Sequence, residues 1–250
     1  MINRFKNKPT AGEKKPGFFD ALLQLFFPER CLLCRDIIAP EIPVPLCNKC
    51  EKSYEGLINI CPRCENFSRL DLDCGCDREV TTLSSISALH TYEADWRSLL
   101  HRLKYRRNRS LSRPLGSLLG NQLLTQANSG FDYVVPVPLH KKRERERGFN
   151  QSALIARHAA AALGADYFEF LVKTRETASQ TAINRQDRLL NVRGAYKVVS
   201  PIAKGATVLL VDDIYSTGST LKEAAKELKE AGAIVHGAVI AYNPPRFTRF

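Results

Sequence analysis

Two neighbouring carboxylates, Asp212 and Asp213, stand between an apolar run and a turn of small, hydroxylated residues. The run, 208–211, is typical of a buried strand in a parallel sheet, and after the turn we expect a helix over 221–231. Backbone amides and the positive end of a helix can hold a phosphate, while carboxylates accept hydrogen bonds from vicinal hydroxyls. The segment therefore predicts a site for a phosphorylated ligand that carries neighbouring hydroxyls. The turn residues expected to hold the phosphate are Ser216, Thr217, Gly218, Ser219 and Thr220.

This order of residues resembles the signature of the type I phosphoribosyltransferases, in which apolar residues, an acidic pair and a Thr/Ser-Gly-Ser/Thr-Thr turn follow one another. The resemblance implies 5-phosphoribosyl-1-pyrophosphate (PRPP) with magnesium as the ligand. It also implies an α/β fold with a parallel sheet flanked by helices. On the residues alone, an ordinary strand, turn and helix with two solvated aspartates stays the alternative.

Eight cysteines, all between residues 31 and 76, form four closely spaced pairs. Paired thiolates at such spacing suit tetrahedral zinc in closed, structural sites. A disulfide framework would need an oxidising compartment, and the sequence carries no export signal that we identify. We expect a small zinc-ribbon module before the sheet, with one or two structural zinc ions and with sequential and interleaved pairing both open. The ligands expected are Cys31, Cys34, Cys47, Cys50, Cys61, Cys64, Cys74 and Cys76.

The formal net charge of +11 suggests an anionic partner: nucleic acid, phosphorylated small molecules or anionic lipid. No apolar run approaches the roughly 20 residues that span a bilayer, so we expect no transmembrane segment and a cytoplasmic location. Segment 18–27 is apolar but is interrupted by Asp20 and Gln24. We interpret it as a short amphipathic helix, with an interfacial membrane anchor as the alternative.

A basic region lies between the cysteines and the acidic pair. We expect a strand over 87–92 and helices over 94–105 and 111–126. This region is either a solvated helix face or a surface that contacts nucleic-acid phosphates. Its cations are Arg97, Arg102, Lys104, Arg106, Arg107, Arg109 and Arg113. The aromatic residues that would stack on bases, unless they belong to the core, are Tyr92, Trp96, Tyr105 and Phe149.

Further along, we expect a strand over 133–138, a basic loop over 140–150, a helix over 151–163 and a strand over 167–172. Loops at the carboxyl ends of parallel strands converge, so the basic loop should face the 212–220 segment. Its cations, among them Arg143 and Arg147, suit pyrophosphate. The polar segment 174–196 corresponds by order to the mobile loop that closes over PRPP in phosphoribosyltransferases.

Four features occur together: the cysteine-rich segment, the segment from Arg143 to Gln151, the 212–220 segment, and the spacing of Arg175, Thr177, Gln180, Arg188 and Asn191. The combination resembles the ComF family, which includes GntX-like proteins, from about 18 to 242. The resemblance implies that Asp212 and Asp213 hold the ribose hydroxyls, that 216–220 hold the 5-phosphate and that the cysteines bind zinc. The candidate catalytic residues are Asp212, Asp213, Arg143 and Arg147.

Members of this family are associated with natural transformation and act on incoming single-stranded DNA. We therefore expect a protein that binds PRPP and magnesium and takes part in handling that DNA. The alternative is an active phosphoribosyltransferase that transfers phosphoribosyl to an unidentified nitrogen acceptor, and a third interpretation is docking of a DNA-processing protein. We divide the chain into a basic tail (1–17), a helix with the zinc ribbons (18–82) and a phosphoribosyltransferase-like domain (83–250).

Overall fold

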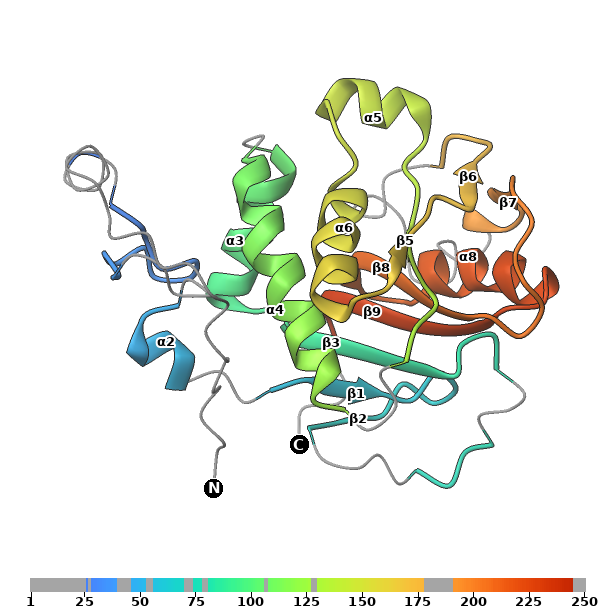
Figure 1. The fold of residues 1–250 in the computed structure, drawn as a ribbon, viewed down its shortest axis with the longest axis horizontal. Helices are drawn as coiled ribbons and strands as arrows, with labels where there is room; N and C mark the ends of the chain where they lie inside the picture. The colour runs from blue at the N-terminus through green and yellow to red at the C-terminus, as the bar shows by residue number, and fades with distance from the viewer. Residues whose placement is uncertain are drawn as a thin grey trace.

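A computed structural model describes residues 26, 28–39, 46–52, 56–69, 74–77, 81–105, 108–126, 130–177 and 191–244. Within these residues the main sheet has seven strands in the order β2-β1-β3-β9-β8-β4-β5 (Figure 1). Five of them run parallel: β3 (Ser85–Thr91), β9 (Ile234–Tyr242), β8 (Thr207–Tyr215), β4 (Tyr133–Pro136) and β5 (Asp166–Tyr167). At one edge β1 (Ile58–Ile60) and β2 (Phe67–Ser68) continue the sheet antiparallel.

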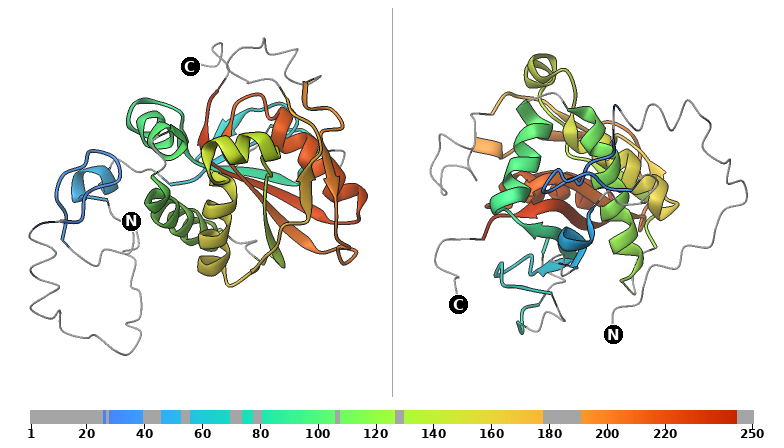
Figure 2. Two further views of the ribbon diagram at one scale, coloured as in Figure 1. Left: turned by 90° about the horizontal axis from the view of Figure 1, so that it is seen from above. Right: turned by 90° about the vertical axis from the view of Figure 1, so that its left-hand side faces the viewer.

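The two central strands, β8 and β9, are buried on both faces. Because successive side chains of a strand point to opposite faces, Leu209 and Val211 pack in one core, whereas Val208 and Leu210 pack in the other. Helices α3 (Ala94–Tyr105), α4 (Ser112–Leu124) and α6 (Gln151–Leu163) contribute to the first core, and α8 (Ser219–Glu230) contributes to the second. Figure 2 shows the three helices on one side of the sheet. This layering explains the continuous apolar run that the sequence shows.

Helices α3 and α6 have the bounds that the sequence predicted. Helix α4 begins after a 3-10 turn, Arg109–Leu111, and packs closely on α6. A Cβ at Gly120 would lie 2.7 Å from Cβ of Ala162 and 2.8 Å from the carbonyl oxygen of Ala159, so only glycine permits this approach.

Three predictions of local structure were wrong. The basic segment, expected as a loop, contains the helix α5 (Lys141–Arg147), with His140 at its N-terminal cap and Gly148 at its C-terminal cap. The strand expected over 167–172 is divided between β5 and β6 (Leu171–Lys173), and β6 pairs with β7 (Tyr196–Val198) in a separate sheet. Helix α8 begins at Ser219, two residues before the expected start.

The cysteine-rich part contains the helix α2 (Asn48–Lys52) and the bridge between Arg30 and Ile37. The expected helix 18–27 lies outside the described residues apart from Phe26, as does most of the segment expected to be mobile, 178–190. The proposed division into three parts stays a prediction. Among the helices of the described ranges, none has the length and hydrophobicity needed to cross a membrane.

Candidate functional site

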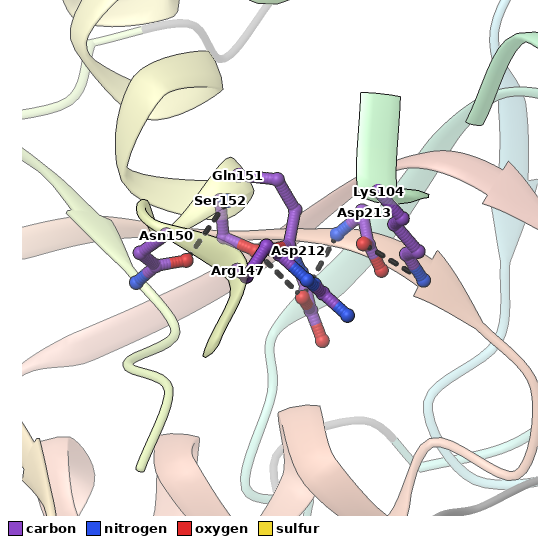
Figure 3. A network of polar contacts seen from close by, with 7 residues as sticks. All are labelled: Lys104, Arg147, Asn150, Gln151, Ser152, Asp212 and Asp213. Carbon is purple, nitrogen blue, oxygen red and sulfur yellow. Dashed lines mark hydrogen bonds and ion pairs between the residues drawn. The ribbon is translucent and has the colours of Figure 1, made fainter. Parts of the chain in front are cut away.

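The acidic pair lies in the C-terminal half of strand β8 rather than in the loop after it. Asp212 and Asp213 are 9% and 5% exposed, and β8 continues to Tyr215. Because neighbouring strand residues point to opposite faces, each carboxylate has its own surroundings. Figure 3 shows the residues that contact them, which come from α3 and from the start of α6.

Asp212 is held from the side of α6. Its Oδ1 accepts a hydrogen bond of 2.8 Å from Ser152 Oγ and another of 2.8 Å from the backbone N–H of Asp213. Burial, followed by repulsion from Asp213, raises the pKa of Asp212 to about 7. The two hydrogen bonds and Lys104 oppose this rise because they favour the ionised carboxylate. Asp212 is thus a carboxyl group that changes charge near neutral pH.

Asp213 has a cationic neighbour from α3. Lys104 Nζ lies 2.9 Å from Asp213 Oδ2, and the side chains are 19% and 6% exposed. The direction of approach does not satisfy hydrogen-bond geometry at Oδ2, so the contact is an ion pair. The sequence placed Lys104 in a general basic surface, whereas the fold brings it to the acidic pair.

The segment 147–152 joins three elements. Asn150 Oδ1 accepts from the backbone N–H of Ser152 at 3.0 Å and caps α6, while Asn150 Nδ2 donates to the carbonyl of Val137 at 3.0 Å. Arg147 Nη1 donates to Gln151 Oε1 (Figure 3). The motif that resembled the ComF signature therefore fixes the start of α6 at the acidic pair. Sequence reasoning missed Ser152, although it is the next residue.

Two further cations, Lys173 of β6 and Arg143 of α5, meet at Thr177, and the charge of Lys173 interacts with Asp212. Lys173 of β6 donates to Thr177 Oγ1 at 2.8 Å, and Arg143 Nη2 donates to the carbonyl of Thr177 at 3.0 Å. Burial, followed by the charge of Arg143, lowers the pKa of Lys173 to about 8, and Asp212 partly offsets this. Lys173 also lies over the Tyr196 ring, 5.2 Å from its centroid. Arg143 was predicted as a site residue and Lys173 was not.

The turn after β8 leads directly into α8. Gly218 has φ 67° and forms the N-terminal cap, and as a glycine it makes no side-chain hydrogen bond to the first backbone amides of α8. A Cβ at Gly218 would collide with the Tyr215 ring, so this position requires glycine on two grounds. Thr217 and Ser219 are buried, and their hydroxyl oxygens are 3.0 Å apart. The turn thus combines the backbone amides of a helix N-terminus, two buried hydroxyls and the positive end of the helix dipole.

The cysteines form two groups in sequential order. Within each group the sulfur atoms all lie within 4.8 Å of one another, and all eight cysteines are free of disulfides. Four sulfur ligands at this separation fit a tetrahedral metal site, so both groups could hold a metal ion. The first cluster is Cys31, Cys34, Cys47 and Cys50, and the second cluster is Cys61, Cys64, Cys74 and Cys76.

The aromatic residues expected for stacking mostly belong to the core: Trp96 and Phe149 are 5% and 6% exposed, and Tyr92 packs against that core. Two of the basic residues also have internal contacts. Arg102 donates to the carbonyl of Leu32, and Arg109 donates to that of Gly148. Arg109 is exposed all the same, as are Arg97 and Arg113, so the nucleic-acid surface expected in this region stays a prediction.

Comparison with known proteins gives consistent matches. A family described as phosphoribosyl transferase domain matches residues 150–246. The DNA utilization protein YhgH of Salmonella typhimurium is 30% identical over 216 residues, which cover 84% of this chain and 94% of that protein. The competence protein ComFC of Streptococcus pneumoniae is 30% identical over 193 residues, covering 75% of this chain and 83% of that protein. ComFC of Bacillus subtilis is 26% identical over 220 residues, covering 81% and 89%.

Proposed function

The chain belongs to the ComF family and has a type I phosphoribosyltransferase fold, and from this premise we propose that it binds PRPP with magnesium and takes part in handling incoming single-stranded DNA. The supporting observation is that the acidic pair of β8 is followed within a few residues by the turn at 216–218 and the N-terminus of α8, and that Lys104 lies 2.9 Å from Asp213. We assign each part of PRPP to protein groups according to their charges.

We assign the 5-phosphate to the amides and hydroxyls of 216–220, because a helix N-terminus favours an anion. The ribose hydroxyls donate to Asp212 and Asp213, which as carboxylates are acceptors. Arg143, Arg147 and Lys173 face the pyrophosphate, because their charges offset its own. The ligand therefore spans an acidic centre between two regions that favour anions.

Magnesium fits this proposal through the chemistry of the donors. Mg²⁺ prefers oxygen ligands and commonly combines one or two carboxylates with phosphate oxygens and water. The acidic pair supplies the carboxylates and PRPP would supply the phosphates. When bound, the ion neutralises charge that builds on the pyrophosphate. For the two cysteine clusters we propose structural zinc, because thiolate sets of this kind form closed sites.

The DNA-handling part of the proposal is supported by the names of two relatives, the DNA utilization protein and the competence protein. The net charge of +11 is consistent with it. Helix α5 has no buried residue and carries five cations and two glutamates in its sequence KKRERER. We assign the electrostatic contact with DNA to the exposed cations of α5, Lys141, Lys142 and Arg145. Because neutralised phosphates release counterions, affinity for single-stranded DNA should fall steeply between about 50 and 200 mM salt.

A phosphoribosyl transfer is the second candidate function, favoured by Lys173. Lys173 and Arg143 both contact Thr177, and their charges would stabilise the pyrophosphate as it leaves. In the transfer, the C1–O bond to pyrophosphate breaks and pyrophosphate keeps the electron pair. An acceptor nitrogen then forms the new C1–N bond, and the proton that it loses goes to the released pyrophosphate. Release of pyrophosphate that requires an added nitrogen compound would support this function.

The proposed function is tested by calorimetric titration of the zinc-loaded protein with PRPP and Mg²⁺. Asp213→Asn removes one charged acceptor and should weaken binding by about tenfold or more. Asp166→Asn is the matched control, because Asp166 is exposed and lies at the other end of the parallel strands. Absence of PRPP binding by the unaltered protein refutes the proposal, as does equal weakening by both substitutions.

A further inference from the structure

The two Cys-x-x-Cys turns that open the clusters have the same backbone structure. In one, the N–H of Cys31 donates to the carbonyl of Asp36 at 2.8 Å. In the other, the N–H of Cys61 donates to that of Asn66 at 2.8 Å. The residue after each second cysteine has a left-handed backbone, with φ 70° at Arg35 and φ 62° at Glu65. Glycine adopts this conformation without strain, whereas a residue with a Cβ atom is strained in it. A glutamate at position 65 therefore calls for an explanation in its side chain.

The Glu65 carboxylate contacts both β8 and α8, the two elements that hold residues 216–220, which we call the phosphate turn. Its Oε1 accepts from Lys222 Nζ at 3.0 Å, and Lys222 lies in the first turn of α8. The same oxygen lies 3.4 Å from the hydroxyl of Tyr215, the last residue of β8. The Glu65 carbonyl also accepts from the hydroxyl of Tyr242 at 3.1 Å. The second cluster is thus joined to both sides of 216–218.

Tyr215 carries this contact into the turn itself. Its side chain is 1% exposed, and its ring fills the space beside Gly218 where a Cβ would lie. A row of rings supports it, because Tyr242 lies 5.8 Å from Tyr215 and Phe67 of β2 lies 5.2 Å from Tyr242, measured between centroids. Movement of Glu65 would therefore shift the Tyr215 ring, against which Gly218 packs.

We propose that the second cluster, when it holds its metal ion, positions the phosphate turn through Glu65. The metal fixes the turn that carries Glu65, and Glu65 then holds Tyr215 and Lys222 in place. This inference rests on the proposed function in treating 216–220 as the phosphate site. The metal ion orders Glu65 and through it the turn, and a phosphate bound at 216–220 orders the same turn. The binding of either ligand should therefore raise the affinity for the other. Glu65 acts here as a positioning residue that does not touch the ligand.

Two substitutions at position 65 separate this role from a role in the metal site. Glu65→Gly removes the carboxylate and relieves the left-handed strain, and Glu65→Gln keeps the size of the side chain. Arg35→Gly is the matched control, because it makes the same change at the same place in the first cluster. All three variants keep all eight cysteines, so metal content should stay at that of the unaltered protein.

Hydrogen exchange of the full-length, metal-loaded protein gives the decisive readout without any ligand. The amides of Lys222 and Asn243 donate to the carbonyls of Gly218 and Tyr215, at the two ends of the turn, and in both Glu65 variants we expect these two amides to exchange about tenfold faster. Arg35→Gly should leave them unchanged. Unchanged exchange in both Glu65 variants overturns the inference, and so does equal acceleration in Arg35→Gly.

The role of the metal is tested by removing one ligand from each cluster. Cys76→Ser should accelerate exchange of the Lys222 and Asn243 amides, and Cys34→Ser should not; the reverse result contradicts the inference. Titration with ribose 5-phosphate should show affinity about tenfold lower in Glu65→Gln. If the unaltered protein does not bind ribose 5-phosphate, the proposed function fails. The exchange comparison still decides whether the second cluster positions the turn.

Discussion

Lys104 Nζ of α3 lies 2.9 Å from Oδ2 of Asp213, the carboxylate that we assign to a ribose hydroxyl. Both side chains are largely buried, so water screens this pair less than a surface pair. Lys104 also lowers the pKa of Asp212, although burial outweighs it. The lysine thus partly neutralises two adjacent carboxylates that burial would otherwise destabilise. It also sets the local charge that an incoming ligand meets.

Replacement of Lys104 by methionine should lower the free energy of unfolding of the ligand-free protein by about 1–3 kcal/mol, because Asp213 loses its cation. Urea denaturation measures the change. Lys226→Met is the control, since its pair with Glu230 is 3.7 Å long and exposed, and should cost under about 0.5 kcal/mol. Equal effects of the two substitutions would show that the Lys104 pair does not stabilise the site.

Asp212 should make stability fall as pH rises. Burial raises its pKa from 3.8 to about 7, so the folded protein holds a proton that the unfolded chain has already released. Between about pH 4 and 7 the folded state binds more protons, and its free energy of unfolding therefore decreases. Asp212→Asn should flatten this dependence in urea denaturation series. The same slope in both proteins would mean that the pKa of Asp212 is not raised.

Lys173 should link pyrophosphate binding to pH. Its pKa is lowered to about 8, so above that pH the ammonium loses its proton and affinity for pyrophosphate should fall. Lys173→Arg stays charged and should keep its affinity from about pH 7 to 9. Calorimetric titration measures both, with Lys197→Arg as control because Lys197 is an exposed residue of the same small sheet. A pH-independent affinity in the unaltered protein excludes a role for Lys173.

Gly218→Ala should damage both stability and phosphate binding. Gly194 offers a matched control because both residues have φ 67°, whereas a Cβ at Gly194 has no atom within 4 Å. Gly194→Ala should cost about 1 kcal/mol from backbone strain alone. Gly218→Ala adds the collision with Tyr215 and should cost about 1–3 kcal/mol more. Equal costs in thermal or urea unfolding would contradict the close contact with Tyr215.

The parts of the fold that follow from local pattern could be predicted. Helix 94–105 was found from apolar residues at helical spacing, and the continuous run before Asp212 indicated a buried parallel strand. Helix α5 was missed because its sequence has no apolar period. Only its caps, His140 and Gly148, signal it. The extension of β8 through two aspartates was missed because aspartate is rare in strands and the pairing with β9 outweighs this preference.

The candidate site was predictable where its residues are consecutive. The turn 216–220 and the cysteine pairs are of this kind. Lys104, Lys173 and Glu65 were not identified as site residues, because each reaches the site from a distant segment, whereas Ser152 was missed although it directly follows the predicted segment 143–151. Sequence spacing carries no signal for such proximity. Sequential grouping of the cysteines also needed the fold, since both pairings satisfy the spacing.

The amide resonances of residues 216–220 give the most direct test of PRPP binding. We expect two-dimensional NMR of the zinc-loaded protein to show these resonances shifting and saturating as PRPP is added with Mg²⁺, together with those of 212 and 213. The same titration with Asp213→Asn should need about tenfold more PRPP. If the resonances of 216–220 stay unchanged while PRPP reaches millimolar concentration, the turn does not bind the 5-phosphate and the proposed function is wrong.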